Sequence, residues 1–304
     1  MRRNVIGFLV GTMSFGAMAS AETDLAAAFG AREQIQQISM SPDGTRLAYV
    51  VPTKGQGSAL LTFAPGIDQQ PKVALVSDGE TDRLSACHWI ANTRLVCDLW
   101  GLTRPPELAN YGIIEFSRVV AVDMDGSNPK MLSKSTGAYA RGYNLNGGAV
   151  IDWLPEDDGA VLMTRNQLAE DRIGWRLGSS EAGIVVDRVD SRTLASSRIE
   201  RVEENISSYL TDGHGNVRVK GIELIEGNRN SGAIRYYFRL ADSKKWEQLS
   251  TYNYMSETGF HPVAVDHERN AVYGFDKEEG RLALYRMALD GCGTRELLLA
   301  RPDV

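Results

Sequence analysis

The 304-residue sequence has few of the residues on which most catalytic and metal sites depend. It contains three cysteines and four histidines, and no set of them has the spacing of a zinc or calcium motif. Beyond Lys244-Lys245 there is no basic cluster, which argues against nucleic acid as a partner. After residue 37 no helix-period segment exceeds a few turns. With 43% hydrophobic and 24% charged residues, the remaining composition is that of a globular protein.

The N-terminal residues are organised as a secretion signal. Arg2 and Arg3 precede an apolar run from Val5 to Ala19, and Ala19-Ser20-Ala21 forms an A-x-A cleavage site. An uncleaved membrane anchor is the alternative, but this run is shorter than the roughly 20 residues that span a bilayer. We therefore expect residues 1–21 to be removed and the chain to be exported, periplasmic or extracellular, with no membrane attachment. Whether the arginine pair directs twin-arginine export stays open.

Cleavage would remove two of the 33 basic residues, leaving 31 against 39 acidic ones and a net charge of −8.

Two of the three cysteines have a spacing that would place them opposite each other. In a hairpin that turns at Asn92, Cys87 lies opposite Cys97, and a cross-strand disulfide is chemically available in an exported protein. Two buried thiols are an equally good interpretation. Cys292, in a turn, has no evident partner.

A pair of hairpins recurs five times along the chain. The first begins with ISMSPDGTRLAYVV, in which apolar residues alternate around a Pro-Asp-Gly turn. Similar inner hairpins begin at residues 38, 87, 150, 207 and 262, and each is followed by a second hairpin such as VVAVDMDGSNPKML. Four antiparallel strands repeated at about 40 to 60 residues are typical of propeller blades. The blades are expected at about 38–78, 87–133, 150–200, 207–251 and 262–300.

The predicted fold class is therefore an all-β propeller with five four-stranded blades. A β-sandwich or two unrelated β domains is the alternative, but a sandwich does not double its hairpins at a regular period. Residues 22–37 form a lead-in segment in which LAAAFGAREQIQQ predicts a short helix. Two insertions, 101–116 and 168–177, separate inner from outer hairpins and are expected at the rim or the central channel.

These features together resemble the N-terminal propeller of exported prolyl oligopeptidase family serine peptidases, in the branch of acylaminoacyl and dipeptidyl peptidases. The resemblance covers roughly residues 25–304 and rests on the Leu-Ala-Ala-Ala-Phe lead-in, ISMSPDGTRLAYVV, WIANTRLV and VVAVDMDGSNPKML. Ser-Pro-Asp-Gly hairpins also occur in Tol-type periplasmic propellers. The family implies seven or eight blades, followed by an α/β-hydrolase domain with a Ser-Asp-His triad.

The sequence departs from that family by stopping after five blades. Two pairs of glycines lie four residues apart, and they enclose Leu9 and Arg176, so there is no GxSxG nucleophile elbow. An open arc, as part of a larger propeller, is accordingly favoured over a closed ring. The family's catalytic residues have no counterpart here, and the chain by itself is expected to be inactive, with no catalytic, cofactor or metal residue assigned.

Several histidines, serines and acidic residues are candidates for a functional role. No histidine (His88, His214, His261, His267) stands beside a strained serine turn, and neither Ser179-Ser180 nor Ser207-Ser208 supplies one. His261 and His267, with Asp266 and Glu268, suggest a metal site only weakly, because their hairpin separates the two imidazoles. Glu156-Asp157-Asp158 and Asp276-Lys277-Glu278-Glu279 lack the alternation of calcium loops and are expected to be solvated tips. Glu203-Glu204 resembles the amine anchor of dipeptidyl peptidase propellers, but adjacent glutamates are common.

The function that this sequence favours is the substrate-gating propeller of a prolyl oligopeptidase-like serine peptidase acting on short peptides. The rival is a free-standing periplasmic propeller of Tol type that binds a protein partner. A third interpretation, a metal-dependent propeller hydrolase, needs inward Glu, Asp and His residues from several blades. Peptide preference and oligomeric state are not determined by the sequence.

Overall fold

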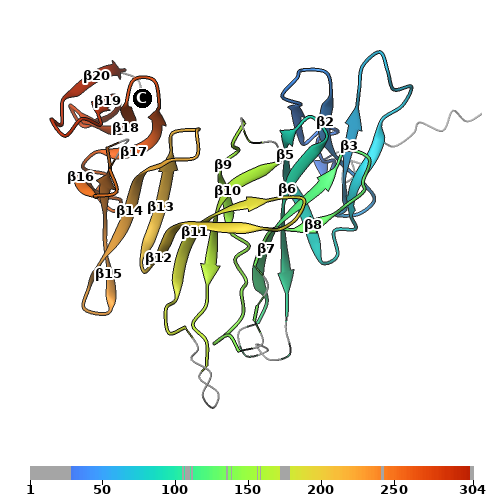
Figure 1. Cartoon of the computed structure of the whole chain (residues 1–304), viewed down its shortest axis with the longest axis horizontal. Helices are drawn as coiled ribbons and strands as arrows, with labels where there is room; N and C mark the ends of the chain where they lie inside the picture. Colours follow the sequence, from blue (N-terminus) through green and yellow to red (C-terminus); the bar gives the residue numbers. More distant parts are fainter. Residues whose placement is uncertain are drawn as a thin grey trace, which may run out of the picture. The chain divides into compact units, whose positions relative to one another are not determined.

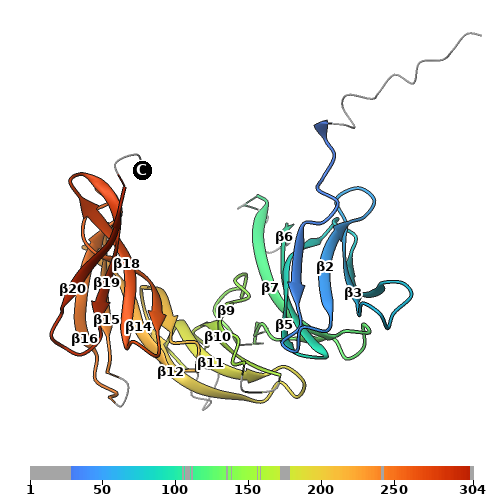
Figure 2. The same ribbon diagram turned by 90° about the horizontal axis from the view of Figure 1, so that it is seen from above.

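The computed structural model describes residues 29–301 except 105, 107–109, 111, 135, 138, 156, 158, 172–178 and 241–242. The predicted signal peptide lies outside these residues. The chain divides into a short unit, Met1–Glu33, and a large unit, Gln34–Val304. Within the described residues all twenty strands belong to the large unit and form five four-stranded antiparallel sheets (Figures 1 and 2). No helix in the described part of the chain is long and apolar enough to cross a membrane.

Each sheet is built from four strands that follow one another in the sequence. The first contains β1 (Gln37–Met40), β2 (Leu47–Pro52), β3 (Ser58–Phe63) and β4 (Lys72–Ser77), and the second contains β5 (Asp82–Ala91), β6 (Arg94–Thr103), β7 (Ile114–Asp123) and β8 (Lys130–Met131). The third contains β9 (Ala149–Asp152), β10 (Ala160–Gln167), β11 (Gly183–Asp190) and β12 (Ser196–Glu203). The fourth contains β13 (Ile206–Thr211), β14 (Val217–Glu226), β15 (Arg229–Phe238) and β16 (Glu247–Asn253). The fifth contains β17 (His261–Asp266), β18 (Ala271–Glu278), β19 (Arg281–Ala288) and β20 (Arg295–Ala300).

The first hairpin shows how the sequence determines these strands locally. Gly44 has a φ of +70°, the left-handed region that glycine adopts without a steric cost. The Asp43 carboxylate accepts hydrogen bonds from the Ser41 hydroxyl at 2.6 Å and from the Thr45 backbone N–H at 3.1 Å. These bonds close an Asx-type turn. Alternation in β2 then places Ala48 and Val50 in the core.

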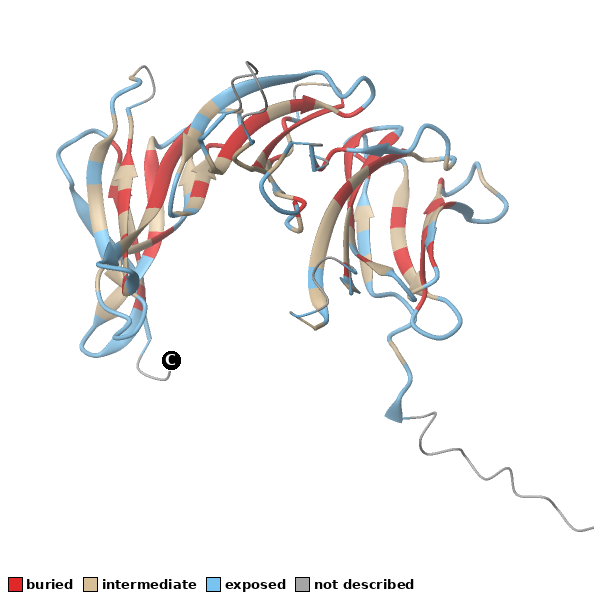
Figure 3. Cartoon of the chain, turned by 90° about the horizontal axis from the view of Figure 1, so that it is seen from below, coloured by how far each residue is buried: buried red, intermediate tan, exposed pale blue. Residues whose placement is uncertain are grey.

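Consecutive sheets are held together by shared apolar clusters, and Figure 3 marks the buried parts of the strands in red. The first and second sheets share a cluster that includes Val50, Leu60, Leu84, Trp89 and Leu95. The second and third sheets share one that includes Val96, Val119, Val161, Met163 and Val189. Leu162 and Val186 of the third sheet pack with Tyr209 and Val217 of the fourth, and Val219 and Tyr236 of the fourth pack with Val272 and Tyr285 of the fifth. Each sheet thus buries apolar residues against the next, as propeller blades do.

The structure confirms the predicted fold class, a β-propeller of five four-stranded blades. The order of strands in every sheet is sequential, and no described strand from one end of the chain completes a sheet at the other end. The strand pairing is therefore that of an open series of blades.

Two expectations about the irregular segments need correction. The loop within 101–116 is shorter than expected, because β6 and β7 extend into both ends of the segment: Gly101 pairs with Phe116 and Thr103 with Ile114. The lead-in helix falls partly on residues outside the description. From Ala31 to Gln36 the chain is not helical. The Gln36 N–H instead donates to the Val50 carbonyl at 2.9 Å, so pairing with β2 outweighs the local helical pattern.

Candidate functional site

The histidines are dispersed over different sheets, and the described ones contact different partners. His88 of β5 lies 4.8 Å from the Trp153 ring, measured between ring centroids. His214 and His267 lie 4.2 Å apart by the same measure, and His267 Nδ1 is 3.0 Å from an Asp212 carboxylate oxygen. Among the described residues no group of three or more His, Cys, Asp or Glu side chains is arranged to hold a metal. His261 and His267, which the sequence placed on one hairpin, serve two separate contacts.

Ser208 and His261 are brought together through a tyrosine. The Tyr236 hydroxyl lies 2.8 Å from His261 Nδ1, and Ser208 forms a hydrogen bond with the same hydroxyl. The His261 ring also stacks on Tyr252, with 4.6 Å between centroids. Because Tyr236 stands between the serine and the imidazole, this chain of hydrogen bonds does not activate a serine nucleophile. It joins the fourth sheet to the start of the fifth. Ser179 accepts a hydrogen bond from the Glu181 N–H at 3.3 Å.

The buried position of His261 predicts that the folded protein loses stability at mildly acidic pH. Burial lowers the pKa of His261 below its ordinary value of 6.5, and burial raises the pKa of Tyr236 to about 12, so both side chains of this contact are neutral at pH 7. Between the folded pKa and 6.5 the unfolded chain binds the extra proton. The free energy of unfolding therefore falls as the pH decreases through that window. We expect urea midpoints at about pH 7.5 to exceed those at about pH 5.5.

The matched variants are His261→Gln and Tyr236→Phe. The first removes the titrating group and should show a smaller difference between the two pH values than the unsubstituted chain shows. The second removes the hydroxyl but leaves the burial that lowers the pKa of His261, so it should keep most of the difference. A His261→Gln variant with the full original pH dependence would contradict the assignment.

One of the two adjacent glutamates, Glu203, is paired with a cation. The Glu203 carboxylate accepts hydrogen bonds from Lys220 Nζ at 2.6 and 2.9 Å. Its charge is therefore neutralised within the protein, which argues against an anchor for a substrate amine. Glu204 lies in the exposed turn that follows β12.

The two acidic turns are solvent-exposed, as expected of solvated tips: the Asp157 side chain is 43% exposed, and Glu278 and Glu279 are exposed. Some of their carboxylates also have partners within the protein. Asp157 pairs with Arg188, with 2.8 Å from Nε to the carboxylate, and Asp276 accepts from Arg295 Nη1 at 2.7 Å. Glu278 accepts a hydrogen bond from the Tyr285 hydroxyl. Residues 156 and 158 lie outside the description. Sequence alone missed these partners because they are contributed by other strands or turns.

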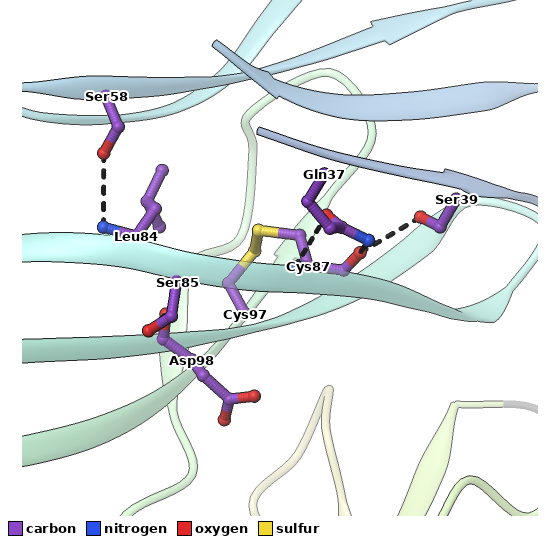
Figure 4. The surroundings of a disulfide bond; sticks show 8 residues. All are labelled: Gln37, Ser39, Ser58, Leu84, Ser85, Cys87, Cys97 and Asp98. Atoms are coloured by element: carbon purple, nitrogen blue, oxygen red, sulfur yellow. Dashed lines mark hydrogen bonds between the residues drawn. A yellow bond between two sulfur atoms is a disulfide. The ribbon is translucent and has the colours of Figure 1, made fainter. Parts of the chain in front are cut away.

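The structure joins Cys87 of β5 to Cys97 of β6 in a disulfide (Figure 4). The two residues are opposite each other in register, with 4.1 Å between their Cα atoms, and both are fully buried. The Gln37 side chain of β1 binds both backbone groups of Cys87: its Nε2 donates to the carbonyl at 3.0 Å, and its Oε1 accepts from the N–H at 3.1 Å. The disulfide thus lies where the first sheet meets the second. Cys292 is a free, exposed thiol.

The first sheet carries exposed apolar residues on the face that points away from its buried cluster. Directly paired residues of antiparallel strands point to the same face. Ile38, Tyr49, Leu61 and Val73 form one such row across all four strands. Ile38 is 57% and Val73 is 55% exposed. The opposite face carries Val50 and Leu60, which belong to the cluster shared with the second sheet.

The fifth sheet has a similar face. Phe275, Leu284 and Leu299 are paired across β18, β19 and β20, and Leu299 is 54% exposed. The opposite face carries Tyr285 and Met287 in the cluster shared with the fourth sheet. These two faces are the candidate functional surfaces of the chain. We call them the first outer face (Ile38, Tyr49, Leu61, Val73) and the fifth outer face (Phe275, Leu284, Leu299).

Contiguous apolar surface of this kind marks an interaction site in soluble proteins. The sequence carries a signal for it: both alternating sets of positions in β2 are apolar, as expected for a strand that packs on both faces. The sequence analysis identified stacked strands but did not identify which faces lack a neighbour.

No protein-family model and no curated protein matches this sequence. Similar solved structures include the β-propeller domain of the trilobed protease from Pyrococcus furiosus, with a TM-score of 0.47 and 12% identity over 89% of this chain and 72% of that one. Acylaminoacyl peptidase from Pyrococcus horikoshii has a TM-score of 0.47 and 10% identity over 89% of this chain and 39% of that one. TolB from Acinetobacter baumannii has a TM-score of 0.37 and 13% identity over 86% of this chain and 54% of that one. The fold assignment rests on the five sheets themselves.

Proposed function

We propose that this chain is the substrate-gating propeller of an exported prolyl oligopeptidase-like serine peptidase that acts on short peptides. The observation that carries the proposal is the apolar outer face on the first and on the fifth sheet. A sheet face rich in apolar residues is stable in water when another layer covers it. In the resembled family, further blades and a hydrolase domain are the layers that would do so.

In this role the propeller contributes no catalytic residue. It restricts access to a triad that lies outside the 304 residues, so that short peptides enter and folded proteins do not. The disulfide Cys87–Cys97 supports the exported location, because such bonds persist in oxidising compartments.

A free-standing periplasmic scaffold is the second candidate. It is favoured by the Ser-Pro-Asp-Gly turn of the first hairpin, a turn that also occurs in Tol-type periplasmic propellers. In that case the two outer faces would be covered by a protein partner instead of by further blades, and the chain would have no peptidase activity in any form.

The two candidates differ in the polypeptide that the natural host produces. We expect its intact mass to exceed that of residues 22–304, and we expect a fluorophosphonate probe to label that same polypeptide on an active-site serine. A product with the mass of residues 22–304, with no labelling and a single cooperative melting transition, would contradict the peptidase proposal and favour the scaffold.

Lysine substitutions on the outer faces test whether these surfaces are covered. In residues 22–304 alone, Val73→Lys or Leu299→Lys should change the free energy of unfolding by no more than about 0.5 kcal/mol, because these side chains face solvent there. In the host's product, where further layers cover them, an unpaired buried lysine should cost several kcal/mol. Urea unfolding of both forms measures the difference. Equal effects in the two forms would show that the faces stay uncovered.

A further inference from the structure

A polar groove of about 840 Å³ runs along the outermost strand of the third sheet. One wall consists of six consecutive residues, Arg198 through Glu203 of β12. Successive side chains of a strand point to opposite faces, so an unbroken run of lining residues means that the groove follows the edge of the strand. β12 is the last strand in its sheet. Within the described residues, the backbone groups on its outer side therefore have no partner strand.

The carboxylates of the groove are neutralised internally. Glu200 pairs with Arg239 at 2.5 Å, and Glu203 pairs with Lys220 at 2.6 Å. Arg198 pairs with Asp187 of the neighbouring strand at 2.6 Å. These ion pairs leave no free negative charge among the glutamates that line the groove.

Two cations of the groove remain available to a ligand. Arg201 of β12 and Lys244, from the segment before β16, both line it and are exposed. Neither has an ion-pair partner among residues that the structure describes. On a chain with a formal net charge of −6, this local excess of positive charge selects for an anionic ligand.

Trp246 provides an apolar surface in the same groove. Its ring lies 4.6 Å from the Arg239 guanidinium carbon and 4.9 Å from Lys220 Nζ, measured to the ring centroid. It also packs against the cluster that contains Tyr209 and Val217. A half-buried tryptophan held by these contacts is a rigid platform for an apolar or aromatic side chain.

An unused hydrogen-bond donor lies close to these groups. The Tyr209 hydroxyl is buried and has no hydrogen-bond partner among the described residues. Burial raises the pKa of Tyr209, and the Glu203 and Glu200 carboxylates raise it further, so the hydroxyl keeps its proton. An unsatisfied buried hydroxyl is costly, and this one lies in the apolar cluster that Trp246 packs against.

We propose that this groove binds an extended acidic peptide segment, which adds as a strand beside β12. The free edge of β12 supplies backbone donors and acceptors. Arg201 and Lys244 bind carboxylates of the segment, and Trp246 takes an apolar or aromatic side chain. The inference stands apart from the proposed peptidase function, because the groove is formed entirely by the third and fourth sheets.

Binding is tested by fluorescence anisotropy of residues 22–304 with a fluorescein-labelled octapeptide that alternates glutamate with valine and contains one phenylalanine. Lys244→Glu and Arg201→Glu should each weaken binding by about tenfold or more, because each reverses a charge that contacts the peptide. Lys245→Glu is the matched control. Lys245 is adjacent in sequence, pairs with Glu247 at 3.3 Å and does not line the groove, so its substitution should leave affinity within about twofold.

Two changes to the probe test the binding mode. N-methylation of alternate peptide bonds blocks strand addition and should abolish binding, and replacement of glutamate by lysine should do the same. Equal affinity for the N-methylated peptide would overturn strand addition. Equal sensitivity to Lys244→Glu and Lys245→Glu would show non-specific charge attraction and overturn the site. Tighter binding of tetragalacturonate that depends on Arg201 and Lys244 would replace the peptide with an acidic saccharide. Absence of binding to all probes would refute the proposal.

Discussion

Replacing Arg94 by methionine is expected to lower the free energy of unfolding by about 3–5 kcal/mol, the usual cost of removing one partner from a buried ionic network. The Arg94 side chain is 0% exposed. Its guanidinium donates to Asp123 at 2.9 Å, to the Asn128 carbonyl at 2.8 Å and to the Ser191 carbonyl at 2.6 Å. Methionine fills a similar volume but donates no hydrogen bond, so these acceptors are left unsatisfied. Since Ser191 belongs to the third sheet's outer turn, the substitution also weakens the contact between the second and third sheets.

Arg46→Met is the matched control, because Thr45-Arg46-Leu47 and Thr93-Arg94-Leu95 occupy the same place in two successive inner hairpins. The Arg46 side chain is 25% exposed and pairs with Asp43 at 3.1 Å. Such a surface pair contributes no more than about 1 kcal/mol. Urea unfolding followed by circular dichroism measures both variants. Similar losses for Arg46→Met and Arg94→Met would show that the buried network is not the cause.

Removing the disulfide should have the second largest effect. The double variant Cys87→Ala, Cys97→Ala is expected to lower the free energy of unfolding by about 2–3 kcal/mol, because the bond restricts the unfolded chain over a short loop. The sequence separation is 10 residues. Both residues are fully buried beside Leu95 and Trp89, so loss of their sulfur atoms also reduces packing between the first two sheets.

Cys292→Ser is the control for thiol chemistry unrelated to the bond, and it should leave stability unchanged because Cys292 is exposed. Dithiothreitol in the denaturant series should lower the stability of the unsubstituted chain and have no effect on the double variant. Identical unfolding curves for the unsubstituted chain with and without reductant would contradict a stabilising role for the disulfide.

The fold was accessible from the sequence because its signals are local. Alternating apolar residues and turns such as Pro42-Asp43-Gly44 define hairpins within about a dozen residues, and the five-fold repetition defines how many sheets there are. Strand ends were harder to place. β12 continues to Glu203 and β5 begins at Asp82, outside the predicted blade bounds of 150–200 and 87–133. Pairing with the neighbouring strand extends each strand beyond the residues whose apolar and polar positions alternate clearly.

The surfaces were accessible only in part. Apolar residues on both faces of β2 and β3 are visible in the sequence, but their pattern does not show which face meets the second sheet. The groove beside β12 is assembled from residues as distant as Arg201 and Lys244, and no local pattern links them. In the sequence, the adjacent residues Glu203 and Glu204 suggested a functional role. In the structure, Glu203 forms an ion pair with Lys220 of the next sheet.

By itself the sequence determined the local chemistry of this protein: strands, turns, the pairing register of Cys87 with Cys97, and the lack of a nucleophile elbow. These depend on residues that are neighbours in the chain. Only the tertiary structure decided which charged side chains are buried in ion pairs and which apolar faces are covered. Two identical Thr-Arg-Leu tripeptides yield one arginine that is 25% exposed and one that is fully buried. The difference arises because burial is set by residues distant in sequence, such as Ser191 against Arg94, and a hairpin carries no information about the sheet that will pack on it.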